Sequence, residues 1–392
     1  MNDFKIIISE TNNNPYKALT IKNQFDIESY LGFFDDFKYS LLWKSEFIDI
    51  LPQNTTKLVL NICHLPHTPE IYISQDLKNK INNDSNTFLW IFSPHEAILD
   101  HNNFAVYLKK QGFRLDKVIV TNSDYRVDGS TITGIKYVSC PEWWEAYYRH
   151  LLKTKDDISF ITPDRRIKNL DAIEKKSLCL NRNVKIHRVW SHYYLLTTGL
   201  YEDSFYSYHL PTMANKDGLV FKEWIREELG KHKNDFPFNK IKNTKRLFKD
   251  RPLDEIDTDY VINLQSNIKE YFEKSALSIV TESLETHDFL TEKTFKAIVH
   301  SHPFITIGGS DINSRLKERG YKLYDEIFGF EHIDNPSDCK RLMERLNNIS
   351  KNELIEYNLQ TKTKIEHNWN NFFTRKICFH DLSTKIGQTL YG

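Results

Sequence analysis

The chain has 392 residues, enough for two domains that each bury a core. Its 53 basic and 53 acidic residues give a formal net charge of zero, which argues against a protein that binds nucleic acid over its whole surface. No run approaches the ~18 apolar residues of a membrane span, and no signal peptide is visible. The five cysteines show no CxxC spacing, which favours a reducing compartment. We therefore expect a cytoplasmic protein.

Short apolar runs alternate with polar or helical segments in the first half of the chain. Runs rich in β-branched and aromatic residues predict strands at 4–8, 57–62, 88–92, 117–121 and 135–138. Helices are expected at 26–33, 103–111 and 142–154. The alternation predicts an α/β fold, with a parallel sheet wrapped by helices in a Rossmann-like domain over residues 1–160. The polar, proline-containing stretch 156–170 is interpreted as a linker.

The second half repeats the pattern and predicts a second Rossmann-like domain over residues 171–360. Strands are expected at 176–180, 204–208, 260–264, 303–307 and near 328–333. Helices are expected at 185–197, 265–274, 336–348 and 351–371. A helical tail, 361–392, is expected to pack back on the first domain. Neither GxGxxG after a strand nor GxxxxGK[ST] is present, which argues against a dinucleotide oxidoreductase and a P-loop protein.

The segment 278–309 is the most informative part of the sequence. An apolar strand ends in Glu282, a polar loop follows, and Thr291, Glu292 and Lys293 open a helix before the next strand. Parallel α/β folds bind ligands at the carboxyl ends of their strands. Carboxylates suit sugar hydroxyls, while a lysine and helix amides suit a diphosphate. The pattern therefore predicts a site for a sugar nucleotide.

This segment resembles the donor-binding motif of the α-1,3-fucosyltransferases, which runs Phe-Glu-Asn-Ser, a short loop and Asp-Tyr-Ile-Thr-Glu-Lys. The positions that match the motif are Glu282, Asp288, Thr291, Glu292 and Lys293. Ser283 stands where the family has Asn. The resemblance implies that Glu292 binds the ribose, that Lys293 binds the diphosphate and that Glu282 lies near the donor sugar. It also implies the GT-B arrangement, with two Rossmann-like domains facing a cleft.

The same family carries an aromatic strand that ends in Glu-Ser-Pro, whose Glu is assigned as the general base. Here an aromatic strand is followed by Ser93 and Pro94, but Phe92 occupies the position of the Glu. The base is therefore expected at Glu96 or His95, unless the reaction lacks a base at this point.

An arginine at a strand-to-helix junction can neutralise a departing diphosphate. Arg182 and Arg188 are the two candidates; Arg188 is favoured because it shares a helix face with Lys185, although a solvated basic helix start fits either arginine. No metal is expected. His64 and His67 lie in a proline-containing loop without a third ligand, and the two acidic residues at 124 and 128 do not form Asp-x-Asp.

The sequence thus predicts an inverting, metal-independent glycosyltransferase that moves a sugar from a GDP- or UDP-sugar to a hydroxyl of a glycan or another acceptor. Two alternatives remain. A basic insertion from Lys231 to Arg251, interleaved with phenylalanines, suits a transferase that acts on modified bases in DNA, although it also suits a solvated loop. The absence of Glu at Phe92 suits a non-catalytic protein that binds a sugar nucleotide or a glycan.

Overall fold

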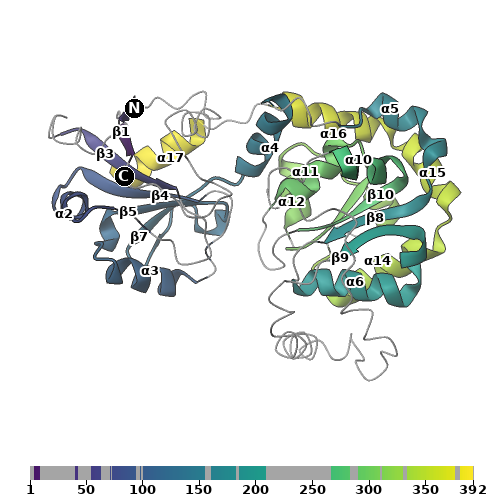
Figure 1. The fold of residues 1–392 in the computed structure, drawn as a ribbon, viewed down its shortest axis with the longest axis horizontal. Helices are drawn as coiled ribbons and strands as arrows, with labels where there is room; N and C mark the ends of the chain where they lie inside the picture. Colours follow the sequence, from purple (N-terminus) through teal and green to yellow (C-terminus); the bar gives the residue numbers. More distant parts are fainter. Residues whose placement is uncertain are drawn as a thin grey trace, which may run out of the picture. The chain divides into compact units, whose positions relative to one another are not determined.

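The computed structural model describes residues 4–8, 40–42, 54–62, 71, 73–93, 98, 100–154, 160–181, 185–208, 266–282, 290–309, 311–329, 333–375 and 380–391. The chain divides into two compact units: Met1–His150 with Lys376–Gly392, and Leu151–Arg375. Each unit is built on a sheet whose strands are parallel, apart from one short edge strand, with helices packed against it (Figure 1). The predicted α/β class is therefore confirmed.

The first unit contains a seven-stranded sheet in the order β2-β1-β3-β4-β5-β7-β6. Its strands are β1 (Phe4–Ile8), β2 (Ser40–Leu42), β3 (Thr56–Ile62), β4 (Thr87–Phe92), β5 (Val118–Asn122), β6 (Thr131–Ile132) and β7 (Ile135–Ser139). Only the pair β6–β7 is antiparallel within the described sheet. All five strands predicted in this half are present. Buried strands of a parallel sheet read as nearly continuous apolar runs, which explains why the sequence located them.

The described helices of the first unit are α2 (Gln75–Asn83), α3 (His101–Lys110), α4 (Trp143–Thr154) and α17 (His380–Tyr391); the last four residues of α4 fall in the second unit. Helices α2 and α3 supply Leu77 and Leu108 to the core on one face of the sheet. Helix α17 packs against β7, where Lys136 Nζ donates to the carbonyl of Thr389 at 2.7 Å. The end of the chain thus belongs to the first unit.

The second unit contains a four-stranded parallel sheet in the order β11-β10-β8-β9. Its strands are β8 (Lys175–Asn181), β9 (Ser204–Tyr208), β10 (Ser275–Thr281) and β11 (Phe304–Ile307). The strand predicted at 260–264 lies outside the described residues. Of the strand expected near 328–333, Phe328 ends the short helix α13 (Asp325–Phe328), and residues 330–332 lie outside the described residues. The helix ends at Gly329, whose φ of +66° favours glycine.

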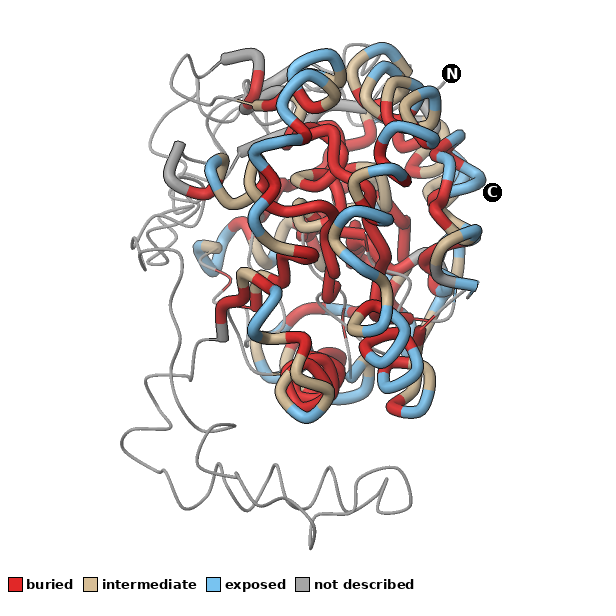
Figure 2. Tube along the Cα trace, turned by 90° about the vertical axis from the view of Figure 1, so that its right-hand side faces the viewer, coloured by how far each residue is buried: buried red, intermediate tan, exposed pale blue. Residues whose placement is uncertain are grey.

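The remaining helices belong to the second unit. They are α5 (Pro163–Lys168), α6 (Ile186–Thr198), α10 (Ser266–Glu273), α11 (Glu292–Val299), α12 (Ile312–Glu318), α14 (Pro336–Asn348), α15 (Lys351–Gln360) and α16 (Lys362–Thr374). Helices α6 and α14 lie along one face of the sheet, and α10 and α11 lie along the other (Figure 1). Buried residues gather in the strands and on the inner sides of the helices (Figure 2). None of the described helices is long and apolar enough to cross a membrane.

Three details differ from the sequence-based expectation. The interval 156–170, interpreted as a linker, contains α5, which begins with Thr162 as N-cap and Pro163 in the first turn. The single helix expected at 351–371 breaks at Thr361, whose hydroxyl donates to the carbonyl of Tyr357 at 2.7 Å. Such side-chain bonds to the preceding turn bend helices. Of the tail expected at 361–392, α16 stays in the second unit.

A buried arginine and a buried histidine lie at the start of β10. Arg166, on α5, donates to the carbonyls of Phe272, Ser275 and Ala276 at 2.7–2.9 Å. Close by, His302 contacts the hydroxyl of Ser278 and the carbonyl of Ser275 through its two ring nitrogens. These contacts attach α5 to the sheet.

The buried histidines of this region should make stability depend on pH. Burial, reinforced by Lys269 and Lys296, lowers the pKa of His300 to about 3, and burial also places the pKa of His302 well below its ordinary value. Between the ordinary histidine pKa and these lowered values, the unfolded chain binds more protons than the folded chain. Stability should therefore fall as pH drops from ~6.5, by up to about 1.4 kcal/mol per pH unit for each histidine.

Urea unfolding measured between pH 7.5 and 4 tests this expectation. His300→Phe keeps a ring for the stack on Phe272, 4.3 Å between centroids, and removes one titrating group. In this variant, folding should release one proton fewer between these pH values, so the unfolding free energy should change less steeply with pH. An unchanged slope would show that His300 is protonated in the folded protein as readily as in the unfolded chain.

Candidate functional site

In the described sheet of the second unit, the order of the strands reverses between β8 and β10. From β8 the chain passes through α6 to β9 on one side, and β10 lies on the other side of β8 and leads through α11 to β11. The segments that leave β8 and β10 therefore diverge to opposite faces of the sheet. Ligands of open α/β sheets bind in the crevice at such a switch point, beyond the carboxyl ends of the strands.

Asn181 and Thr281 mark this point, since each is the last residue of its strand. The Thr281 hydroxyl donates to the side-chain carbonyl of Asn181, and Asn181 Nδ2 donates to Ser191 Oγ on α6 at 3.4 Å. All three side chains are buried. The two strand ends are thus tied together and to the first turns of α6.

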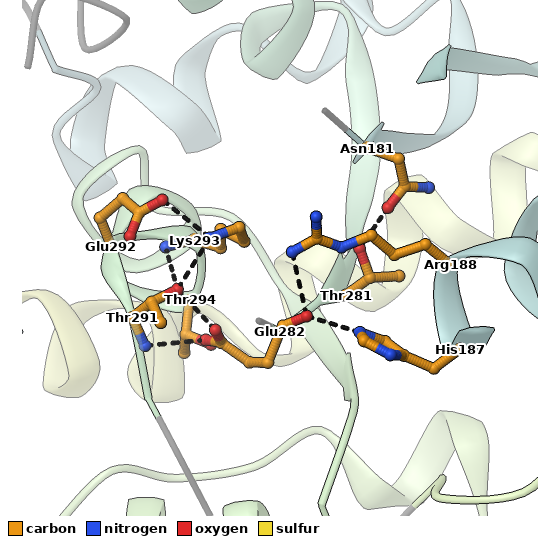
Figure 3. A network of polar contacts seen from close by, with 9 residues as sticks. All are labelled: Asn181, His187, Arg188, Thr281, Glu282, Thr291, Glu292, Lys293 and Thr294. Carbon is orange, nitrogen blue, oxygen red and sulfur yellow. Dashed lines mark hydrogen bonds and ion pairs between the residues drawn. The ribbon is translucent and has the colours of Figure 1, made fainter. Parts of the chain in front are cut away.

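The beginning of α6 reaches across to the residue that follows β10 (Figure 3). His187 Nε2 and Arg188 Nη2 contact the backbone carbonyl of Glu282, at 2.5 and 3.1 Å. Both side chains are buried. Arg188, predicted to meet the diphosphate, therefore lies at the switch point and holds the chain after β10. Arg182, the other candidate, lies outside the described residues.

The carboxylate of Glu282 turns to the opposite face, toward α11. It accepts hydrogen bonds from the backbone N–H of Thr291 at 3.2 Å, from the Thr291 hydroxyl at 2.6 Å and from the Thr294 hydroxyl. A carboxylate at a helix N-terminus satisfies unpaired donors and complements the helix dipole. Glu282, which is 0% exposed, thus positions the start of α11, and its predicted role near the donor sugar stays a prediction. Ser283 lies outside the described residues.

Glu292 and Lys293 form the first turn of α11, after Thr291 as N-cap. Lys293 Nζ donates to Glu292 Oε1 at 2.9 Å and to Thr291 Oγ1 at 3.2 Å (Figure 3). The other carboxylate oxygen of Glu292, Oε2, is buried and has no hydrogen-bond partner in the described part of the chain. The structure thus brings the three motif residues together, and Oε2 of Glu292 is left without a hydrogen-bond donor among the described residues.

Electrostatics keeps Glu292 ionised. Burial by itself would raise the pKa of this carboxyl, but Lys293, Lys296 and the hydrogen bond from Lys293 outweigh burial and lower the pKa to about 2. At neutral pH the site therefore presents an anionic oxygen that can accept hydrogen bonds. Hydroxyl groups of a ligand are donors that fit this oxygen.

Sequence reasoning missed His187, Asn181, Thr281 and Thr294. Two signals could have found some of them. Asn181 and Thr281 are polar residues that end apolar strands, and Thr294 follows the N-cap Thr291 by three positions. His187 gave no such signal, because its contact with the Glu282 carbonyl depends on β8 and β10 being neighbours in the sheet.

In the first unit, the structure places a core residue where the family resemblance expects the general base. Phe92 is 0% exposed and packs edge-on against Trp90, 5.3 Å between ring centroids. The alternative bases, His95 and Glu96, lie outside the described residues, so this assignment stays a prediction.

The described residues contain no group of three His, Cys, Asp or Glu side chains that could hold a metal ion. Asp124 is paired with Arg126 at 2.7 Å, and Asp128 with Lys385 at 2.8 Å. His64, His67 and the basic insertion 231–251 lie outside the described residues.

No family model matches the chain, and no curated protein does. Among solved structures, the chain is similar to a UDP-forming α,α-trehalose-phosphate synthase from Burkholderia xenovorans, with 11% identity and a TM-score of 0.37 over 95% of this chain and 80% of that one. It is also similar to an E. coli trehalose-6-phosphate protein bound with UDP-2-fluoro glucose, with 11% identity and a TM-score of 0.39. That match covers 88% of this chain and 75% of the other. TM-scores this low carry no information on the site residues.

Proposed function

We propose that the chain is a nucleotide-sugar-dependent glycosyltransferase whose donor binds in the second unit, at the carboxyl ends of β8 and β10. The proposal rests on one observation above all: Oε2 of Glu292 is buried, belongs to an ionised carboxylate and has no hydrogen-bond partner in the described part of the chain. A buried acceptor without a donor is costly. The hydroxyls of a ribose would supply donors at this position.

The surrounding charges suit the diphosphate of such a donor. Lys293, Lys296 and Arg188 carry three positive charges, against the two negative charges of Glu282 and Glu292. The N-terminus of α11 adds the positive end of a helix dipole. An anion at this position would therefore be stabilised without a metal ion, and Lys293, at the first turn, would meet the leaving diphosphate.

The reaction that fits this arrangement is an inverting displacement. A base of the first unit, Glu96 or His95, would deprotonate the acceptor hydroxyl, and the positive groups around α11 would stabilise the departing nucleoside diphosphate. The resemblance to fucosyltransferases makes GDP-fucose one candidate donor, and other GDP- and UDP-sugars remain candidates because Ser283 replaces the family's Asn. The cytoplasmic location also stays a prediction.

Thermal shifts of the full chain with GDP-, UDP-, ADP-, CMP- and dTDP-sugars, without added metal, test the donor site. A ligand at a hundred times its dissociation constant stabilises the folded state by about 2.7 kcal/mol. One nucleotide class should raise the melting temperature, and Glu292→Gln should lose this shift because it removes the anionic acceptor. The matched control Glu318→Gln, an exposed carboxylate on α12, should keep the shift. If no nucleotide sugar raises the melting temperature, the proposed donor site is wrong.

A second candidate is a protein that binds a sugar nucleotide or a glycan without transferring it. The buried position of Phe92, where the resemblance expects a base, favours this alternative. Donor binding without hydrolysis or transfer across a broad acceptor panel would support it. Turnover of the donor would exclude it.

A further inference from the structure

A row of buried polar side chains lies at the carboxyl edge of the sheet in the first unit. Asn122, the last residue of β5, pairs in register with Ser139, the last residue of β7. On the other side of β5, Ser93 follows β4 directly, and its N–H donates to the carbonyl of Thr121 at 2.9 Å. Strand alternation points these three side chains to the same face, because residues two positions earlier along each strand belong to one core cluster. We call Ser93, Asn122 and Ser139 the polar row.

Tyr137 and His101 extend this row on the same face. Tyr137 lies two residues before Ser139 on β7, and its ring packs edge-on against the ring of His101, 4.9 Å between centroids. His101 is the first residue of α3, and Phe104, Ala105 and Leu108 of this helix belong to the core under this face of the sheet. A hydroxyl and an imidazole thus lie next to the polar row.

Several side-chain atoms of this group lack a hydrogen-bond partner among the described residues. The side chains of Asn122, Tyr137 and Ser139 are at most 2% exposed. The atoms that have no hydrogen-bond partner in the described part of the chain are Asn122 Nδ2, Ser139 Oγ, the Tyr137 hydroxyl and His101 Nδ1. Native proteins leave few buried polar groups unpaired, since each one destabilises the folded state. Four such atoms around one place indicate a ligand or ordered water.

The imidazole of His101 and the phenol of Tyr137 are uncharged at neutral pH. Burial lowers the pKa of His101, while Asp124 and Arg126 act on it in opposite directions, so the imidazole is uncharged at neutral pH. Burial also raises the pKa of Tyr137, which stays a phenol. Asp124 pairs with Arg126 and Asp128 with Lys385, and Asp100 accepts hydrogen bonds from the backbone and side-chain amides of Asn103. The group itself thus contains no charged side chain that could pair with a charged ligand.

We propose that the polar row, with Tyr137 and His101, binds hydroxyl groups of an uncharged carbohydrate. The unpaired amide N–H of Asn122, the unpaired hydroxyls of Tyr137 and Ser139 and the neutral imidazole of His101 match hydroxyl groups, which themselves donate and accept. The position at the carboxyl edge of a parallel sheet is where such folds bind ligands. This site lies in the other unit from the proposed donor site and requires no nucleotide.

Ligand-observed NMR titrations of the full chain with glucose, galactose, mannose, lactose and maltose test the proposal. At least one saccharide should bind in the millimolar range. Tyr137→Phe and Ser139→Ala each remove one hydroxyl with little change of shape, so each should weaken that binding roughly five- to tenfold. Tyr324→Phe, a buried tyrosine of the second unit, should leave the affinity unchanged.

Two variants distinguish the saccharide site from the proposed donor site. Glu292→Gln should keep the saccharide affinity of the parent, and Tyr137→Phe should keep any thermal shift produced by a nucleotide sugar. The proposal is overturned if none of the five saccharides binds, or if binding is unchanged in both Tyr137→Phe and Ser139→Ala. The unpaired atoms would then be satisfied by ordered water.

Discussion

Replacing Arg166 with methionine is expected to lower the free energy of unfolding by about 3–5 kcal/mol. The guanidinium is 2% exposed and donates to three backbone carbonyls, those of Phe272, Ser275 and Ala276, and to Asn358 Oδ1. Burial lowers its pKa to about 9, so it remains charged at neutral pH. Methionine would fill similar space but leave several buried acceptors without donors, and this loss outweighs the relief of burying a charge.

Neighbouring Arg165 provides the control for this experiment. It pairs with Glu273, its side chain is half exposed, and Arg165→Met should cost less than about 1 kcal/mol. Arg166→Lys keeps the charge but has fewer donors in another geometry, so it should recover only part of the loss. Urea unfolding of the three variants measures these differences. A cost below about 1 kcal/mol for Arg166→Met would show that the carbonyls find other partners, and that α5 is held by apolar packing.

The fold could be predicted from the sequence wherever burial left a strong pattern. Strands such as β4 and β10 are almost entirely buried and rich in apolar residues, because both faces of a parallel sheet are covered by helices. Helix α2 was missed because only Leu77 and Ile81 are buried in nine residues, too few to show a helical period. Helix α12 was missed for the same reason, since its seven residues bury few apolar side chains.

The candidate site was predictable in composition but not in arrangement. Spacing and resemblance identified Glu282, Thr291, Glu292 and Lys293, which the structure places together at the start of α11. The direction in which the Glu282 carboxylate points could not be read, because that depends on which face of β10 carries α11. The contact from α6 to the Glu282 carbonyl depends on β8 and β10 being neighbours, although a hundred residues separate them. Such long-range pairing leaves no local sequence signal.

Lys293→Ala is expected to reduce turnover of the donor by about 10²–10³-fold, a prediction that rests on the proposed function. The ammonium lies in the first turn of α11, 2.9 Å from Glu292 Oε1, and its side chain is 19% exposed. A positive charge there would stabilise the leaving diphosphate most strongly in the transition state, where negative charge develops. The fold should be little affected, because the lysine side chain is partly exposed and lies in the first turn of α11.

Hydrolysis of the nucleotide sugar identified by thermal shift provides the assay, since it requires no knowledge of the acceptor. Lys296→Ala is the matched control, because Lys296 also lowers the pKa of Glu292 but lies one turn further along α11. If Lys293 acts on the diphosphate, its removal should reduce kcat far more than removal of Lys296. If it acts only by keeping Glu292 ionised, both variants should raise KM to a similar extent and leave kcat unchanged, because Glu292 would then bind the ribose equally in the ground and transition states. Parent-like hydrolysis by Lys293→Ala would show that Lys293 only caps and charges the helix.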